Sequence, residues 1–254
     1  MTVAPKKALG QHFLVDENLL GVIGRLAALA PDDVVLEIGP GLGVLTRYLA
    51  DRVALVHAVE LDRSLEQHLP VRDEVRLHFG DALTLDLAAL EPPPSKLVSN
   101  LPYNVATPIV VESLDRLPAL DSWCVMVQRE VADRFFAPPA TKAYGAVSVL
   151  VQLAAERTGF HAVSRTAFRP RPNVDSALVA FRRRPLPADF AALKRVVQAA
   201  FAHRRKTLPN SLELAGLTSR TQASEALAAF GRAADTRAEA LAPEEFIRLA
   251  ALLA

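Results

Sequence analysis

The chain has 254 residues, 51% of them hydrophobic, and a formal net charge of +1. This length allows one large core and one small one, and no apolar run approaches the ~18 residues of a membrane-spanning helix. The single cysteine, Cys124, excludes an internal disulfide and a zinc cluster, and residues 1–11 lack the apolar stretch of a secretory signal, so we expect a cytosolic protein.

Short apolar runs alternate with amphipathic stretches over the first two thirds of the chain, which is the pattern of strand–helix units. Asp16 can cap a helix over 17–29. Further helices are predicted at 44–52, 64–69, 108–114, 129–135 and 146–155, and strands at 34–38, 54–59, 75–79, 97–99, 123–127, about 157–160, and 178–182. Seven strands with helices between them predict a Rossmann-like, doubly wound α/β fold with a mostly parallel sheet.

After Arg184 only the helical period remains. The sequence Pro185-Leu186-Pro187 is typical of a hinge, and helices are predicted at 190–202, 206–215, 221–230 and 243–253. We therefore predict two domains: 1–184, which contains the sheet, and 185–254, which is built of helices alone.

A glycine-rich turn joins the first predicted strand to its helix. Residues 37–43 read Glu-Ile-Gly-Pro-Gly-Leu-Gly, and alternate glycines let the backbone turn sharply and approach a ligand beneath a helix N-terminus. Glu60 ends the second strand twenty-one residues beyond Gly39, where a ribose-binding acid is expected. Asp81 follows the third strand and can accept a hydrogen bond from an adenine amine. Together these strand ends predict an adenosine-shaped site.

Two cofactors compete for such a site. Dinucleotide enzymes usually show G-x-G-x-x-G, whereas the spacing here is G-x-G-x-G and the acidic Glu37 precedes it. A carboxylate at that position would repel a pyrophosphate. S-adenosylmethionine has no phosphate and carries a cationic sulfonium, so the acidic turn favours it over NAD.

A second motif, Asn100-Leu101-Pro102-Tyr103, follows the fourth predicted strand. It offers a side-chain amide, backbone carbonyls in a proline-fixed turn and an aromatic face, although Asn and Pro are also ordinary turn residues. Acceptors aimed at the hydrogens of an exocyclic amine would hold that amine, and a stacked ring would fix the plane of its base. The motif predicts an acceptor site for a planar base.

The charge is distributed unevenly along the chain. Twelve Lys or Arg residues between Arg157 and Lys206, here named the basic belt, face only two Asp; the local net charge is +10, which leaves −9 for the rest. Such an excess in an otherwise acidic chain is typical of a polyanion-binding surface and indicates a nucleic acid. The six histidines show no metal-ligand spacing, so no metal site is expected.

In this order, the motifs resemble those of the ribosomal-RNA adenine dimethyltransferases, most closely the KsgA type. The resemblance runs from about residue 6 to the end at the family's usual spacings. Besides the glycine-rich turn, Glu60, Asp81 and the Asn100–Tyr103 motif, it rests on residues 7–14 (KALGQHFL), 128–131 (QREV), 144–145 (YG), 168–176 (FRPRPNVDS), 204–207 (RRKT) and 210–212 (NSL).

The resemblance implies an enzyme that uses S-adenosylmethionine to dimethylate N6 of two adjacent adenosines in the 3′-terminal hairpin loop of small-subunit (16S) ribosomal RNA during ribosome assembly. By position, it implies that the cofactor is bound by Gln11, His12, Leu14, Gly39, Gly41, Glu60, Asp81 and Asn100. The first three would close over it, the glycines would lie along its methionine part, Glu60 would bind the ribose and Asp81 the adenine amine. His12 stands where many relatives have Asn.

For the acceptor, the resemblance implies that Asn100, Leu101 and Pro102 hold the amine while Tyr103 and Phe168 stack on the two faces of the target base. It also implies an RNA-binding set: Arg169, Arg171, Arg204, Arg205 and Lys206. Arg171 stands where many relatives have proline. Direct methyl transfer needs neither a covalent enzyme intermediate nor a strong general base, so placement should dominate the rate. The expected partner is the immature small ribosomal subunit, with no membrane and no metal, and the expected state is a monomer.

Three other functions compete with this interpretation. A large-subunit rRNA adenine methyltransferase of the macrolide-resistance type shares the cofactor and acceptor motifs, but residues 201–212 resemble the small-subunit enzymes instead. A largely noncatalytic ribosome assembly factor would not need intact cofactor and acceptor motifs. A small-molecule methyltransferase would not need the basic belt.

Overall fold

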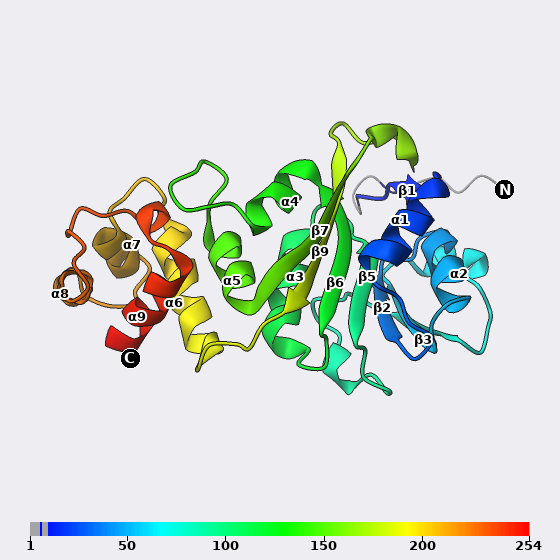
Figure 1. Ribbon diagram of the computed structural model, residues 1–254, viewed down its shortest axis with the longest axis horizontal. Coiled ribbons are helices and arrows are strands. Elements are labelled where there is room, and N and C mark those ends of the chain that lie inside the picture. Colours follow the sequence, from blue (N-terminus) through cyan, green and yellow to red (C-terminus); the bar gives the residue numbers. More distant parts are fainter. Residues whose placement is uncertain (1–5, 7–9, 254) are drawn as a thin grey trace. The chain divides into compact units, whose positions relative to one another are not determined.

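The computed structural model describes Lys6 and residues 10–253. The chain divides into two compact units, the first comprising Met1–Ala132 with Arg157–Arg183 and the second Asp133–Glu156 with Arg184–Ala254. Each unit has its own helices, and we describe them separately (Figure 1).

The first unit is built on a seven-stranded sheet. Its strands lie in the order β4 (Val75–Phe79), β3 (Leu55–Glu60), β2 (Val34–Ile38), β5 (Lys96–Asn100), β6 (Ser122–Gln128), β9 (Ser176–Arg183) and β7 (Ala155–Val163). The pairs from β4 to β6 are parallel, and β9 runs antiparallel to β6. The chain leaves β2 towards β3 on one side and returns to β5 on the other. In doubly wound sheets, ligands bind at such a switch point, outside the carboxyl ends of the strands.

Both faces of this sheet are covered. Alternate residues of the central strands, such as Val35 and Cys124, pack with α1 (Asn18–Leu26) and α2 (Val44–Ala50) into one core. On the other face, Trp123 stacks on Phe181 with ring centroids 5.1 Å apart and donates to Ser113 of α3 (Ala106–Arg116) over 2.8 Å. Because successive strand residues point to opposite faces, two-sided burial explains the nearly continuous apolar runs of these strands.

The predicted α/β fold is confirmed, but several local predictions change. The segment predicted as a helix at 64–69 is a 3₁₀ helix, η2 (Arg63–His68), which ends before Leu69 because that residue precedes Pro70 and adopts an extended conformation. α1 ends at Leu26, short of the predicted 29, since Ala28 has a φ of 47°. A two-stranded antiparallel ribbon of β1 (Phe13–Leu14) and β8 (Phe168–Arg169) was not predicted, because two-residue strands leave no periodic signal.

The second unit is helical. It contains α5 (Ala146–Ala154), α6 (Phe190–Ala202), α7 (Leu208–Leu214), α8 (Arg220–Ala228) and α9 (Pro243–Leu252). Its aromatic centre joins Tyr144, Phe201 and Phe246, with successive ring centroids 5.9 and 5.8 Å apart. The remaining elements of the chain are α4 (Arg129–Phe135), η3 (Leu87–Ala89), η4 (Arg165–Ala167) and η5 (Ala238–Ala240).

The segment 133–156 groups with the C-terminal helices although it precedes the predicted boundary at residue 184. An amphipathic period predicts a helix such as α5 but does not say against which core that helix packs. The assignment of methyl transfer to 1–184 and of RNA binding to 185–254 stays a prediction. Among the described residues, no helix has the length and apolarity to cross a membrane, and no three His, Cys, Asp or Glu side chains gather as metal ligands would.

Candidate active site

A cavity of about 270 Å³ lies in the first unit, at the carboxyl ends of β2, β3, β4 and β5. Gly10, Gln11, His12, Phe13 and Leu14, here named the N-terminal wall, close one side of it. The rest of the lining comes from the strand ends and the turns after them, including Glu37, Gly39, Gly41, Glu60, Asp81, Asn100, Leu101, Pro102 and Tyr103. Every residue predicted to bind the cofactor therefore lines one cavity.

The glycine-rich turn brings three walls of the cavity together. Gly39 and Gly41 have φ angles of 73° and 59°, which side chains with a Cβ rarely adopt. A Cβ on Gly41 would lie 2.9 Å from the Phe13 ring, and one on Gly39 would lie 3.2 Å from Pro102. These two positions need glycine both for their backbone angles and for the close approach of neighbouring walls.

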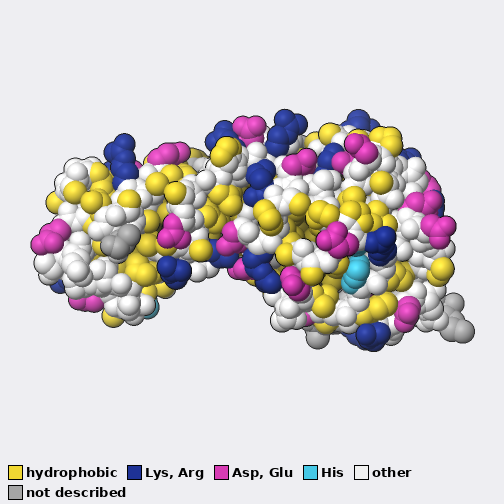
Figure 2. Space-filling view, turned by 90° about the horizontal axis from the view of Figure 1, so that it is seen from below, with side chains coloured by type: hydrophobic (Ala, Val, Ile, Leu, Met, Phe, Trp, Pro, Cys, Tyr) yellow, Lys and Arg dark blue, Asp and Glu magenta, His cyan; other side chains and the backbone are white. Residues whose placement is uncertain are grey.

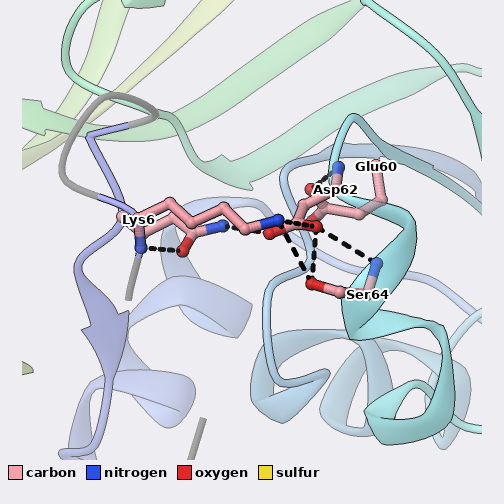
Figure 3. Close-up of polar contacts among 5 residues, drawn as sticks. Lys6, Glu60, Asp62 and Ser64 are labelled. Atoms are coloured by element: carbon pink, nitrogen blue, oxygen red, sulfur yellow. Dashed lines mark hydrogen bonds and ion pairs between the residues drawn. The ribbon is translucent and has the colours of Figure 1, made fainter. Parts of the chain in front are cut away.

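Glu60 is fixed by the backbone around it. One carboxylate oxygen accepts the Gly41 N–H over 3.2 Å. The other accepts the Asp62 N–H over 2.8 Å (Figure 3). Glu60 is only 6% exposed, and this burial raises the pKa of its carboxyl above the usual range. The acid is thus held rigidly at the end of β3, beside the glycine-rich turn.

Glu37 is more deeply buried, at 1% exposure. Burial raises the pKa of Glu37 to about 8; the nearby Thr46 hydroxyl opposes this rise and the charge of Glu60 adds to it. Its Oε2 atom has no hydrogen-bond partner among the described residues. From the sequence, Glu37 is predicted to be an anion that repels phosphate; with a pKa of about 8 its protonated form prevails at neutral pH. A cation bound beside it would favour the ionised form.

Asp81 follows β4 and is exposed at the edge of the cavity. Its Oδ1 atom accepts the Leu83 N–H over 2.9 Å, which fixes the direction of the carboxylate. This arrangement leaves the carboxylate with further acceptor capacity for a donor in the cavity.

Asn100 ends β5 and connects the acceptor motif to the N-terminal wall. Its Nδ2 donates to the carbonyl oxygen of His12 over 3.0 Å, whereas its buried Oδ1 has no hydrogen-bond partner among the described residues. The Leu101 side chain is 1% exposed and belongs to the core, so only its backbone can serve a ligand. The carbonyl of Pro102 accepts the Val105 N–H over 3.1 Å and closes the turn.

Tyr103 is half-buried and held at both ends. Its hydroxyl forms a hydrogen bond with Ser176, and its ring centroid lies 5.3 Å from that of His12 at an interplanar angle of 31°. Burial raises the pKa of the Tyr103 hydroxyl. His12 is itself placed by a 2.7 Å hydrogen bond between Nδ1 and the Pro170 carbonyl.

Phe168 differs from the other predicted site residues. Its side chain is 2% exposed and packs in the core of the first unit. It is not among the described residues that line the cavity. The strand register places Phe168 opposite Leu14, so the ribbon buries its ring. Its role as the second stacking face stays a prediction, which this conformation does not support.

The residues predicted to bind RNA are distributed over both units. Arg169 and Arg171 are exposed in the first unit, on either side of Pro170. In the second, Arg204 donates to the Tyr144 carbonyl over 2.8 Å and is therefore partly engaged. Arg205 and Lys206 are exposed. Figure 2 shows Lys and Arg side chains interspersed with Asp and Glu on the face it draws, without a continuous basic stripe there.

One member of the basic belt has a structural role. Arg183 donates to the carbonyls of Leu114 and Leu117 over 2.7 and 2.8 Å, and also to that of Leu120, while its guanidinium lies 4.9 Å from the centre of the Trp123 ring. These contacts satisfy carbonyls at the end of α3. The position of Arg183 within the basic belt gave no sign that its role is structural, because the sequence does not separate it from the belt arginines that can contact a polyanion.

Several lining residues were missed by the sequence analysis, among them Phe13, Ile38, Leu61, Ala82 and Ile109. All are apolar, and an apolar residue beside a motif gives no signal that separates lining from core. Leu61 is the exception, because it is 53% exposed immediately after Glu60. Its position next to the predicted ribose-binding acid could have indicated it.

A model of the family described as ribosomal RNA adenine dimethylase matches residues 4–254. The chain belongs to this family. Among its relatives, the ribosomal RNA small subunit methyltransferase A of Rubrobacter xylanophilus is 48% identical over 253 residues, which cover 98% of this chain and 95% of the relative. The protein of the same name from Syntrophotalea carbinolica is 45% identical and covers 100% of this chain and 98% of its own. The family predicted from the motifs is confirmed.

Solved structures agree with membership in the dimethylase family. The 23S rRNA methyltransferase ErmE is 30% identical with a TM-score of 0.63, covering 95% of this chain and 99% of its own. A dimethyladenosine transferase from Plasmodium falciparum has a TM-score of 0.78 and covers 94% of this chain and 96% of its own. At 22% identity, the latter likeness supports the fold alone.

Proposed function

We propose that this member of the dimethylase family is an S-adenosylmethionine-dependent rRNA adenine N6-dimethyltransferase. Its proposed substrate is a pair of adjacent adenosines in the 3′-terminal hairpin loop of small-subunit (16S) rRNA, modified in the cytoplasm by a monomer during ribosome assembly. The observation that carries the proposal is the buried Oδ1 of Asn100 at the end of β5, which has no hydrogen-bond partner among the described residues. It lies on the wall that the cofactor cavity shares with the acceptor turn.

The lining fits S-adenosylmethionine. When bound, this cofactor supplies a methyl group activated by a sulfonium cation. Gly39 and Gly41 allow the close backbone approach that its methionine part needs, and Glu60 offers a rigid carboxylate to the ribose hydroxyls. Glu37 Oε2, which has no hydrogen-bond partner among the described residues, suits the sulfonium cation, because a positive charge beside it would favour the ionised carboxylate.

The acceptor turn supplies the contacts that hold an exocyclic amine. Asn100 Oδ1 lacks a partner among the described residues, so it can accept one amine hydrogen without giving up an existing bond. The Pro102 carbonyl already accepts from Val105, which favours the Leu101 carbonyl for the second hydrogen. Two acceptors on the amine favour a tetrahedral nitrogen with a localised lone pair, so placement lowers the barrier without a strong base.

Stacking on Tyr103 would fix the plane of the base, and a loop adenosine is more easily unstacked than one in a duplex. After the first transfer a methyl group replaces one amine hydrogen. The amine must then rotate, or the RNA must rebind, before the second transfer. Exposed Arg169 and Arg171 on the first unit and Arg205 and Lys206 on the second would bind the RNA backbone.

The choice of the small subunit rests on relatives of nearly equal length. The proteins named ribosomal RNA small subunit methyltransferase A are 42–48% identical to this chain, whereas ErmE, named as a 23S rRNA methyltransferase, is 30% identical. Because both kinds share the fold, the fold alone does not choose between the two subunits.

The test uses three substrates: small subunits that lack the modification, large subunits, and naked 16S rRNA. Each is incubated with the protein and labelled S-adenosylmethionine, and methylated positions are mapped as stops of reverse transcription. We expect label at two adjacent adenosines of the small subunit. Label confined to the large subunit would overturn the assignment, and tight binding without any transfer would favour the assembly-factor function.

A further inference from the structure

Asp62 and Lys6 form an ion pair just outside the cavity. Asp62 lies two residues beyond Glu60, and neither it nor Lys6 is among the described residues that line the cavity. The distance between Lys6 Nζ and Asp62 Oδ1 is 2.7 Å; the Lys6 side chain is 52% exposed and that of Asp62 only 4% (Figure 3). A buried carboxylate beside a functional site needs several partners to offset its desolvation.

Asp62 accepts from three side chains. Besides Lys6, the Ser64 hydroxyl donates to Oδ1 over 2.6 Å, and the Gln11 amide donates to Oδ2 over 3.2 Å. Lys6 contributes most to lowering the pKa of the Asp62 carboxyl well below its usual range, and Ser64 follows. The carboxylate is therefore ionised throughout the physiological pH range.

The pair connects the N-terminal wall to the glycine-rich turn. The Lys6 backbone N–H donates to Gln11 Oε1 over 2.7 Å, so Lys6, Gln11 and Asp62 close a ring of hydrogen bonds. From Asp62 the connection continues through its own N–H to Glu60. Glu60 in turn accepts the Gly41 N–H.

The N-terminal wall is held at its other end by different contacts. The Val15 N–H donates to the Ala167 carbonyl over 2.9 Å, His12 bonds to the Pro170 carbonyl, and the strands β1 and β8 pair. Among the described residues, the ion pair and the Gln11–Asp62 hydrogen bond therefore attach the start of the wall, and the β1–β8 ribbon attaches its end.

We propose that Lys6 and Asp62 are positioning residues, a latch that holds the N-terminal wall against the cavity and so sets how tightly the cofactor is retained. The proposal rests on the proposed function, because it assumes that the cavity binds S-adenosylmethionine. Neither residue contacts the reacting atoms. Loss of the latch should therefore weaken cofactor binding and speed its release, while the rate of methyl transfer at saturation changes little.

The variants are Lys6→Met, which removes the charge at similar length, Lys6→Arg, which keeps it, and Asp62→Asn. Arg72→Met is the matched control, since Arg72 forms an exposed ion pair with Asp51 outside the cavity. By calorimetry we expect the Kd for S-adenosylmethionine to rise about three- to fivefold in Lys6→Met and roughly tenfold or more in Asp62→Asn. Lys6→Arg and Arg72→Met should stay near the wild type. In the double variant Lys6→Met/Asp62→Asn, the factor by which the Kd rises should be smaller than the product of the factors measured for the two single variants.

A second readout does not depend on the cofactor. Hydrogen exchange of peptides covering residues 10–15 should speed up in Lys6→Met, while peptides of β2 and β3 remain unchanged. Unaltered exchange of residues 10–15 together with unaltered cofactor affinity in Lys6→Met would overturn the latch. If the wild type binds no S-adenosylmethionine but exchange at 10–15 still responds to Lys6→Met, the proposed function fails and the latch stands as a structural device.

Discussion

At the scale of single residues, two oxygen atoms set the chemistry of the cavity. Glu37 Oε2 and Asn100 Oδ1 are buried without a hydrogen-bond partner among the described residues. A buried polar atom without a partner costs about 1–3 kcal/mol. Both atoms lie on the ends of neighbouring strands at the switch point, where a ligand would satisfy them. Each of these two acceptors leads to a prediction.

Asn100→Ala removes the unpaired acceptor together with the bond to the His12 carbonyl. We expect kcat to fall by about a hundredfold or more, by analogy with the loss of one preorganised hydrogen bond at a reacting centre. RNA affinity should stay nearly unchanged, because the basic residues are untouched. Asn18→Ala, an exposed position on α1, is the control. A large loss of RNA affinity in Asn100→Ala, measured by filter binding, would contradict the role given to Asn100.

Glu37→Gln tests the raised pKa through protein stability. Below the ordinary pKa of 4.5 both folded and unfolded chains hold the proton; as pH rises towards about 8, only the unfolded chain loses it, so the wild type loses stability over this range. The glutamine variant keeps a neutral side chain and should lack that loss. The difference in free energy of unfolding should therefore grow between pH 5 and 8, on the order of a few kcal/mol. Urea titrations at several pH values measure it, with exposed Glu66→Gln as the control; a constant difference would refute the buried acid.

At the scale of elements, parallel strands gather the site. The carboxyl ends of β2, β3, β4 and β5 meet at one edge of the sheet, so residues far apart in the chain line one cavity. The β1–β8 ribbon then brings the N-terminal wall to that edge. The other end of the sheet has a purely structural task, because there Arg183 of β9 fixes the end of α3.

Arg183→Met should lower stability without weakening RNA binding. The variant leaves the carbonyls of Leu114 and Leu117 without their donor and removes the contact with the Trp123 ring, at a cost of about 2 kcal/mol. Arg182→Met, on the exposed side of the same strand, is matched for charge and should leave the melting temperature nearly unchanged. If Arg183→Met melts like the wild type and binds RNA more weakly, Arg183 belongs to the RNA-binding surface after all.

At the scale of the whole molecule, the residues of the basic belt do not share one role. The belt runs through the division between the two units, and its members have different tasks. Arg183 supports the sheet domain and Arg204 contacts Tyr144 in the second unit, whereas Arg205 and Lys206 are exposed, and neither side chain forms an ion pair or hydrogen bond with another described residue. The RNA contribution of the second unit should therefore concentrate in the last two.

Replacing Arg205 and Lys206 by Gln should weaken binding to the small subunit and make it less sensitive to salt. Removing one phosphate-binding side chain reduces the slope of log K against log salt by about 0.7–0.9. kcat at saturating RNA should not change, since neither residue lines the cavity. Arg220→Gln, an exposed position on α8, removes one positive charge from the same unit and serves as the control for each of the two replacements. Equal salt slopes for the double variant and the wild type would exclude both residues from the RNA interface.

Local sequence determined much of the first unit. The strands β2 and β4 were predicted to the residue, and the glycine-rich turn, Glu60, Asp81 and Asn100 were all assigned to one ligand site. Such predictions succeed because short apolar runs, turn-forming glycines and strand-end carboxylates act over a few residues. The prediction for 64–69 missed that this helix is a 3₁₀ helix, and it placed the end one residue too late because Pro70 holds Leu69 in an extended conformation.

The sequence by itself determined the family, the α/β fold and the order of the motifs, since these depend on local periodicity and on residue types at fixed spacing. Only the tertiary structure decided which groups meet: that burial raises the pKa of Glu37, that the Phe168 side chain packs in the core, that Arg183 holds α3, and that Lys6 pairs with Asp62. The physical reason is that burial and hydrogen-bond partners depend on residues distant in the chain. A charge or a ring therefore acquires its role only when the fold supplies its surroundings.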